Sequence, residues 1–277
     1  MSIKTILVHL NNERRADVLL DVAAAIAAAS GARLIGTFAM PPLRIYGGSP
    51  AEAQRIADDK RKLEEMRERL RGIFQAKLAD AAVAGEWLAL QADESGAGAL
   101  VSRCRSADLV VASQADPDFD WSSDIDIPQN LIMESGRPVL LIPYAGTFKT
   151  IGRRVVLAWN DSRESARAAF DALPLMTADT EADVVWFSPG QTASSTAKAS
   201  TEAMAATLER HGIKANARQS FASDIAVGSE MLNHAADSGA DLLVMGCYGH
   251  SRLREMLLGG ATREILGSMT IPVLMSH

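Results

Sequence analysis

The sequence predicts an α/β protein made of two tandem, doubly wound domains, each with a five-stranded parallel sheet, related by a pseudo-two-fold axis. Apolar segments rich in Val, Leu and Ile, without strict alternation, are separated by helical segments along the whole chain. The same order of segments occurs twice. The chain has 277 residues, of which 48% are hydrophobic, and this is enough for two domains with separate cores.

Three pairs of segments carry the internal repeat. Two of the pairs lie 133 or 134 residues apart and the first pair about 149, so the first copy contains a longer insertion. We therefore expect domains at residues 1–146 and 147–277, joined near residues 144–152. The pairs are TILVHLNN (5–12) with VVLAWND (155–161), ADLVV (107–111) with ADLLV (240–244), and RPVLLI (137–142) with IPVLM (271–275).

The elements follow in the same order in both copies. A helix over residues 17–30 is expected to end at Gly31, a suitable C-cap. A second, long helix over residues 50–84 has one apolar stripe, formed by Ile56, Leu63, Met66, Leu70, Ile73, Phe74, Leu78 and Ala81. The expected strands are residues 3–10, 33–39, 87–91, 107–112 and 138–142, then 154–159, 183–188, 215–221, 241–245 and 272–275.

Glycines follow the fourth strand of the second copy, at the end of the sheet where ligands bind in this fold class. Gly246 and Gly249 come directly after the strand, and Gly259 precedes a short helix over residues 262–266. Glycine permits positive φ and the close approach of a ligand, while the start of a helix offers unpaired N–H groups and a positive dipole end. A phosphate is the expected occupant.

The spacing G-x2-G-x9-G, with its flanking strands in the right order, resembles the nucleotide-binding signature of the ATP-binding branch of the universal stress protein family. Residues 155–162 resemble that family's first strand and turn, and residues 271–275 its last strand. The resemblance implies a Rossmann-like fold of the adenine nucleotide alpha hydrolase type. It also implies ATP, alone or with Mg²⁺ or Mn²⁺, and a regulatory role in the stress response.

The resemblance further implies a binding set in the second copy. Gly260 stands where the family usually has Ser or Thr, Thr262 offers a second hydroxyl, and Asn160 replaces a commonly acidic residue. Pro189 matches a position that lines the adenine, and Tyr248 can stack or donate a hydrogen bond. The expected nucleotide contacts are Ala158, Trp159, Asn160, Pro189, Met245, Gly246, Tyr248, Gly249, Arg252, Gly259, Gly260, Ala261 and Thr262.

Each of these residues also has a purely structural interpretation. The glycines can serve tight turns, Trp159 can be a packing residue, and Arg252 can face solvent. Asn160 and Asp161 can cap the following helix, with Asp161 and Glu164 at capping-box spacing.

The first copy lacks the glycines. Ser113 and Asp116 stand at the positions of Gly246 and Gly249, within a segment that also holds four further aspartates. Clustered carboxylates repel a triphosphate, and Pro128 removes an amide donor near the expected helix start. We therefore expect the first copy to be a universal stress protein-like domain with a degenerate site, whose acidic segment is solvated or holds a divalent cation. The further aspartates are Asp118, Asp120, Asp124 and Asp126.

The motifs favour binding over catalysis. The sequence has no G-x-S-x-G elbow and no Walker motif, so no catalytic residue is assigned and slow ATP hydrolysis is the most we expect. Two alternatives stay open: a nucleotide-free interaction protein acting through dimerisation or client contacts, and an adenylate-handling catalyst. The signatures of the latter, H-x-G-H or S-G-G-x-D, are absent.

The composition argues against two kinds of partner, nucleic acid and the membrane interior. A net charge of −6 and a pI of about 5.4 argue against nucleic acid, and no apolar run is long enough to span a membrane. The start resembles a strand rather than a signal segment, so we expect a cytosolic protein. Cys104 and Cys247 form no CxxC pair, and no metal site is assigned. Protein clients and self-association are left open. In the family that the chain resembles, single-domain members pair through their last edge strands, and the resemblance implies that residues 138–142 and 272–275 pair antiparallel in the same way and cover two apolar edges.

Overall fold

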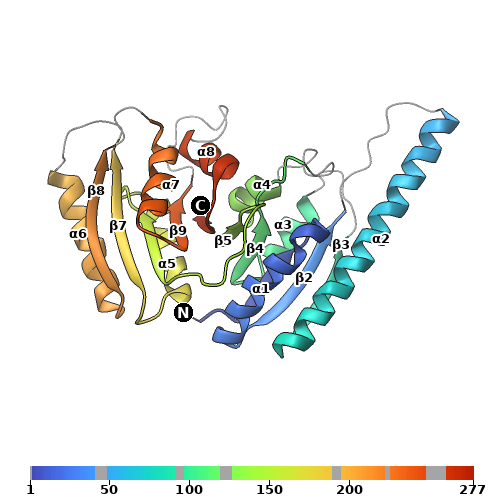
Figure 1. The fold of residues 1–277 in the computed structure, drawn as a ribbon, viewed down its shortest axis with the longest axis horizontal. Helices are drawn as coiled ribbons and strands as arrows, with labels where there is room; N and C mark the ends of the chain where they lie inside the picture. Colours follow the sequence, from blue (N-terminus) through green and yellow to red (C-terminus); the bar gives the residue numbers. More distant parts are fainter. Residues whose placement is uncertain are drawn as a thin grey trace. The chain divides into compact units, whose positions relative to one another are not determined.

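The computed structural model describes residues 2–40, 49–90, 97–118, 127–188, 195–221, 225–247 and 260–277. The chain divides into two compact units, which are called the N-terminal unit (Ile3–Ser135) and the C-terminal unit (Gly136–His277) below. In both, helices pack against a largely parallel sheet (Figure 1). The predicted tandem α/β fold is confirmed. The domain boundary expected at residues 146 and 147 stays a prediction.

The N-terminal unit has four parallel strands in the order β3-β2-β1-β4. Because β1 lies between β2 and β4, the chain winds outward from β1 in both directions. The strands are β1 (Thr5–His9), β2 (Arg33–Ala39), β3 (Gly85–Leu90) and β4 (Leu109–Ser113), and the helices are α1 (Glu13–Ser30), α2 (Pro50–Ala81), α3 (Gly98–Cys104) and α4 (Ile127–Glu134).

The C-terminal unit has the expected five parallel strands, in the order β10-β9-β6-β7-β8. A sixth strand, β5 (Val139–Ile142), pairs with β10. The other strands are β6 (Arg154–Ala158), β7 (Glu181–Ser188), β8 (Lys214–Phe221), β9 (Leu242–Gly246) and β10 (Val273–Ser276). The helices are α5 (Arg163–Ala172), the 3-10 helix η1 (Leu173–Leu175), α6 (Ser195–Arg210), α7 (Val227–Asp237) and α8 (Gly260–Ser268).

One hydrogen-bond motif confirms the internal repeat. In the N-terminal unit, Asp108 just before β4 accepts hydrogen bonds from the backbone N–H groups of Lys4 and Thr5 at 2.8 and 2.9 Å. In the C-terminal unit, Asp241 just before β9 accepts from the N–H groups of Gly152 and Arg154, each at 3.0 Å. Each carboxylate therefore ties the start of the fourth strand of its copy to the start of the first.

The helix α1 begins earlier than the expected residue 17. Its N-cap is Asn12, whose Oδ1 accepts a hydrogen bond from the N–H of Arg14 at 2.8 Å. This bond satisfies one of the donors that a helix leaves unpaired at its start. At the other end, Gly31 has a φ of +64° and forms the predicted C-cap.

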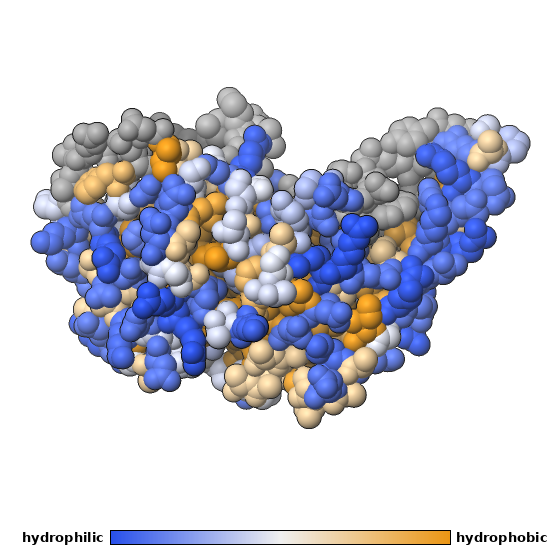
Figure 2. Space-filling model, viewed as in Figure 1, coloured by the Kyte–Doolittle hydropathy of each residue, from blue (hydrophilic) through white to orange (hydrophobic). Residues whose placement is uncertain are grey.

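The long helix α2 follows its predicted apolar stripe only in part. Leu63, Met66, Leu70 and Phe74 are buried, and Gly36 of β2 allows the Phe74 ring to approach the sheet closely. The first thirteen residues of α2 contain no buried side chain, and Figure 2 shows mainly hydrophilic residues over this part. Among the described helices, even the 32-residue α2 is not apolar enough to cross a membrane.

The predicted antiparallel pairing of β5 with β10 is confirmed. Val273 lies opposite Leu141, Leu274 opposite Leu140, and Met275 opposite Val139, and all of these side chains are buried. The pairing covers two apolar strand edges that would otherwise be exposed for aggregation.

The substitution Leu274→Asp tests how much the β5–β10 pairing contributes. It places an unpaired charge at a fully buried position, so we expect a loss of about 4 kcal/mol or aggregation. Urea denaturation measures the loss, and Thr270→Asp adds the same charge at an exposed position as the control. A Leu274→Asp protein as stable as the control would contradict the expectation.

Candidate functional site

The candidate site lies at the carboxyl ends of β6 and β9 in the C-terminal unit. These strands are adjacent and parallel, with Ala158 opposite Met245 in the last register pair. β6 has β9 on one side and β7 on the other, so this is the point where the winding direction of the chain reverses. The N-termini of α5 and α8 follow these two strands and therefore lie at the same end of the sheet.

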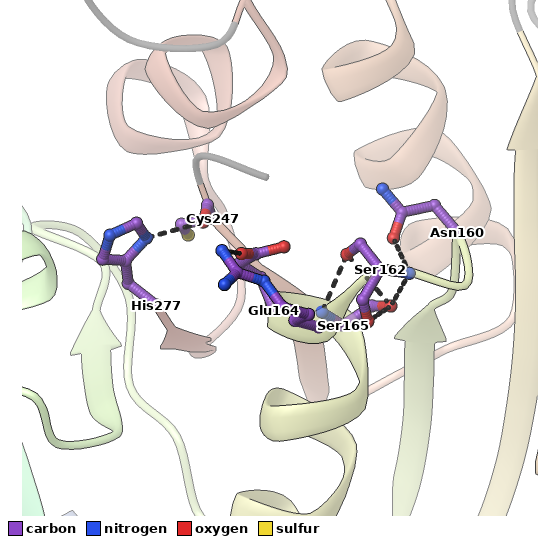
Figure 3. A network of polar contacts seen from close by, with 7 residues as sticks. Asn160, Ser162, Glu164, Ser165, Cys247 and His277 are labelled. Atoms are coloured by element: carbon purple, nitrogen blue, oxygen red, sulfur yellow. Dashed lines mark hydrogen bonds and ion pairs between the residues drawn. The ribbon is translucent and has the colours of Figure 1, made fainter. Parts of the chain in front are cut away.

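The start of α5 is held by a capping box. The Ser162 hydroxyl accepts from the N–H of Ser165, and the Ser165 hydroxyl accepts from the N–H of Ser162, both at 3.1 Å (Figure 3). The predicted capping pair of Asp161 and Glu164 is wrong by one residue. Asp161 has a φ of +58°, whereas an N-cap needs the extended backbone that Ser162 provides.

Glu164 lies in the first turn of α5 and is 5% exposed. Burial alone raises the pKa of this carboxyl, but hydrogen bonds from its own backbone N–H, from Arg163 and from the Ser162 hydroxyl outweigh burial and leave the pKa below its usual value. The Arg163 guanidinium lies 2.9 Å from Glu164 Oε1. The negative charge thus sits at the positive end of the helix dipole and is compensated there.

Gly246 has a packing role that the sequence did not indicate. A Cβ at this position would meet the backbone of α5, including the carbonyl oxygen of Glu164 at 2.7 Å and the amide nitrogen of Ser165. The close approach of β9 to the start of α5 therefore requires glycine. Gly246 thus determines how closely α5 approaches the end of β9. Its contact with a phosphate stays a prediction.

The helix α8 begins at Gly260. Among the described residues, no heavy atom lies within 4 Å of where a Cβ of Gly260 would be. Thr262 is only 3% exposed, and its side chain hydrogen-bonds the Cys247 thiol. Burial raises the pKa of Cys247 to about 12, with the Thr262 hydrogen bond opposing the shift. Burial likewise raises the pKa of Cys104, in α3, to about 12.

Contacts with α7 fix the direction of α8. A Cβ on Gly228 would lie 2.7 Å from Glu264 Oε2 and 3.0 Å from the carbonyl oxygen of Ala261, so glycine permits the two helices to touch. The Ser229 hydroxyl donates a hydrogen bond to the Glu264 carboxylate. The residue pair Gly228 and Ser229 was missed by sequence reasoning because its partners are more than 30 residues away.

The end of β9 is joined to the chain terminus. The N–H of Cys247 donates to the carbonyl of Ser276 at 2.9 Å, and His277 Nδ1 lies 3.0 Å from the carbonyl oxygen of Cys247 (Figure 3). Since a carbonyl only accepts, Nδ1 of His277 carries the proton in this contact. Sequence reasoning gave His277 no role.

Trp159 packs against a neighbouring helix. Its indole Nε1 donates to the Ser200 hydroxyl of α6 at 2.9 Å, and its backbone N–H donates to the carbonyl of Val185. Ala158, Trp159 and Met245 are all buried. All three therefore pack in the interior at the ends of β6 and β9, and their contact with a nucleotide stays a prediction. Asn160 is exposed, and its Oδ1 accepts from the N–H of Ser162 at 3.3 Å.

Five of the expected contact residues lie outside the described residues, and their roles stay predictions: Pro189, Tyr248, Gly249, Arg252 and Gly259.

The corresponding end of the N-terminal unit is closed by buried polar side chains. Asn12 Nδ2 donates to Asp116 Oδ2 at 3.2 Å, and Asp116 Oδ1 accepts from the N–H of Asp118 at 3.0 Å. Ser113 and Gln114 are also buried here. Across the described residues, no group of three or more His, Cys, Asp or Glu side chains is placed to hold a metal ion. The other aspartates of the acidic segment, 120, 124 and 126, lie outside the described residues.

Comparison with known proteins identifies the second half of the chain. The model of the universal stress protein family matches residues 152–277. These residues form a universal stress protein domain. Universal stress protein Slr1230 of Synechocystis is 41% identical over 44 residues, and universal stress protein YxiE of Bacillus subtilis is 44% identical over 45. Each match spans 16% of this chain, and the two span only 15% and 30% of the relatives' own length.

Solved structures resemble the whole two-unit chain, beyond the universal stress protein domain itself. A universal stress protein from Archaeoglobus fulgidus superposes with a TM-score of 0.74 at 14% identity, over 98% of this chain and 97% of the other. A functionally unknown protein from Pseudomonas aeruginosa gives a TM-score of 0.62 at 15% identity, over 99% and 92%. At such identities the likeness shows the fold alone.

The packing role of Gly246 in the universal stress protein domain is tested by Gly246→Ala. The added methyl group meets the α5 backbone, so we expect a loss of about 3 kcal/mol without any ligand present. Gly260→Ala is the matched control, because its Cβ enters open space. Urea denaturation of both variants measures the difference, and equal stability would contradict the packing role.

Acid should lower the free energy of unfolding of the N-terminal unit, because His9 is buried there as a neutral ring. Burial lowers the pKa of His9 from 6.5 to about 4. The folded state keeps the ring neutral while the unfolded chain takes up a proton below pH 6.5. Stability is therefore full above pH 6.5 and falls by about 3 kcal/mol towards pH 4.

Urea denaturation between pH 7 and pH 4 measures this loss. His9→Gln should flatten the pH dependence, whereas His211→Gln, at an exposed position, should leave it unchanged. The same pH dependence in both variants would show that His9 does not cause it.

Proposed function

We propose that the C-terminal universal stress protein domain binds an adenine nucleotide, with ATP as the expected ligand, and that the protein is a regulatory binding protein of the stress response. One observation carries the proposal. The first turn of α8 follows β9, so it starts at the carboxyl ends of β6 and β9, where the winding of the sheet reverses. Backbone N–H groups at the start of a helix and the positive end of its dipole suit a phosphate.

The phosphates would be held by backbone groups. Gly260 and Ala261 begin α8, and the contacts of Gly228 and Ser229 hold this helix in place. The spacing of Gly246, Gly249 and Gly259 supports a loop that wraps the phosphates. A site of this kind binds without needing a charged side chain in contact with the ligand.

The nucleoside end would lie near Asn160. This side chain is exposed at the exit of β6, and its Oδ1 is used in the turn before α5. Its Nδ2 group makes no hydrogen bond with the part of the chain that the structure describes, so it can donate to a ribose or a base. Buried Trp159 and Ala158 form the adjoining wall.

A nucleotide-free interaction protein is the second candidate. Two observations favour it: the Thr262 hydroxyl is engaged with the Cys247 thiol, and the Glu164 carboxylate brings negative charge to the same end of the sheet. Protein purified without added nucleotide distinguishes the candidates, because bound ATP or ADP is detected by absorbance and chromatography. An absence of nucleotide together with an absence of ATP binding would favour the second candidate.

Calorimetry should find about one ATP site per chain, with or without Mg²⁺ or Mn²⁺. Gly249→Asp or Gly259→Val should abolish binding, because the new side chains oppose positive φ and occupy phosphate space. Gly267→Val is the control, since a Cβ at Gly267 in α8 enters open space. Two equivalent sites, or unchanged binding in both loop variants, would contradict the proposal.

A further inference from the structure

The hydrogen bond between Asn12 and Asp116 connects two loops that are 104 residues apart. Asn12 is the N-cap of α1, and Asp116 follows β4. Both side chains are buried, with Asp116 9% exposed. Arg15, in the first turn of α1, interacts electrostatically with this carboxylate. Burial lowers the pKa of Arg15, and the negative charge of Asp116 opposes that shift. The carboxylate therefore lies beside the start of α1 and is compensated there.

The C-terminal unit has a different arrangement at the same place. Strands β4 and β9 are offset by 133 residues, so Asp116 stands at the position of Gly249, which has no side chain. The N-cap of the first helix is Ser162 instead of Asn12, and its hydroxyl is used within the capping box with Ser165. Within the described residues, the Asn12–Asp116 pair of the N-terminal copy therefore has no counterpart between α5 and the end of β9.

The Asp116 carboxylate lies where the start of α1 favours a negative charge. The start of an α-helix of this length attracts an anion through its N–H groups and its dipole. In the N-terminal unit the chain supplies that anion itself. The cap amide of Asn12 donates a hydrogen bond to Asp116, and the Arg15 guanidinium adds positive charge nearby.

We propose that Asp116 is a built-in anion that occupies the ligand position of the N-terminal unit, so that this unit is stable without nucleotide and closed to it. That this is a ligand position rests on the proposed function of the C-terminal unit, whereas the anion rescue described below tests the built-in anion by itself. It predicts that a small free anion can replace the carboxylate when the side chain is removed.

The test is anion rescue of Asp116→Gly. Loss of a buried, hydrogen-bonded carboxylate should lower the Tm by about 3–8 °C. Sodium formate or inorganic phosphate, at ionic strength held constant with chloride, should restore part of this loss. Wild type and Asp118→Gly, which removes an exposed neighbouring carboxylate, should show no comparable gain. The rescue should disappear when Asn12→Ala is added, because the amide that holds the anion is gone.

The outcomes are distinct. Asp116→Gly with wild-type stability, or a loss that neither anion restores beyond the wild-type response, overturns the proposal. Should Asp116→Gly fail to fold, Asp116→Asn tests the charge alone. It should lower the urea midpoint and gain nothing from formate, since the amide fills the space, and an unchanged midpoint overturns the proposal. Calorimetry with ATP on wild type reports separately on the C-terminal unit.

Discussion

Parallel pairing of neighbouring strands is the constraint on which both units depend. Parallel strands need a crossover between them, so each of the strands β1–β4 and β6–β9 is followed by a helix that starts at the same end. In the C-terminal unit this brings the starts of α5 and α8 together beside β6 and β9. Gly246 then sets how closely α5 approaches β9, and Gly228 how closely α7 approaches α8. The geometry of the site is thus determined by backbone packing more than by reactive side chains.

The two copies share the same strand framework but differ in the residues at the carboxyl ends of their strands. Asp108 and Asp241 perform the same backbone contact in each copy, so the strands are held alike. At the carboxyl ends, however, the N-terminal unit has buried polar side chains, including His9 and Asp116, whereas α8 of the C-terminal unit begins with the small residues Gly260 and Ala261. The described parts of the two copies thus differ at one end of the sheet.

The strands and their succession along the chain were predictable from the sequence, because continuous apolar segments and the internal repeat identify them without knowledge of distant contacts. The pairing of β5 with β10 was expected from the family resemblance, and the structure contains it. The helix starts were less predictable. The candidate capping pairs Asp161 with Glu164 and Ser162 with Ser165 differ by one residue, and the choice between them depends on the backbone angle of Asp161. The roles of Gly246 and Gly228 depend on backbone atoms brought close only by the tertiary fold, so no local pattern reveals them.

The burial of both cysteines has a consequence for redox chemistry. Cys104 and Cys247 are the only thiols of the chain, and burial raises the pKa of each to about 12. At neutral pH the thiolate is therefore strongly disfavoured at either position, and the thiolate is the form that attacks peroxides and disulfides. In the folded protein both thiols are therefore poor reactants towards mild oxidants.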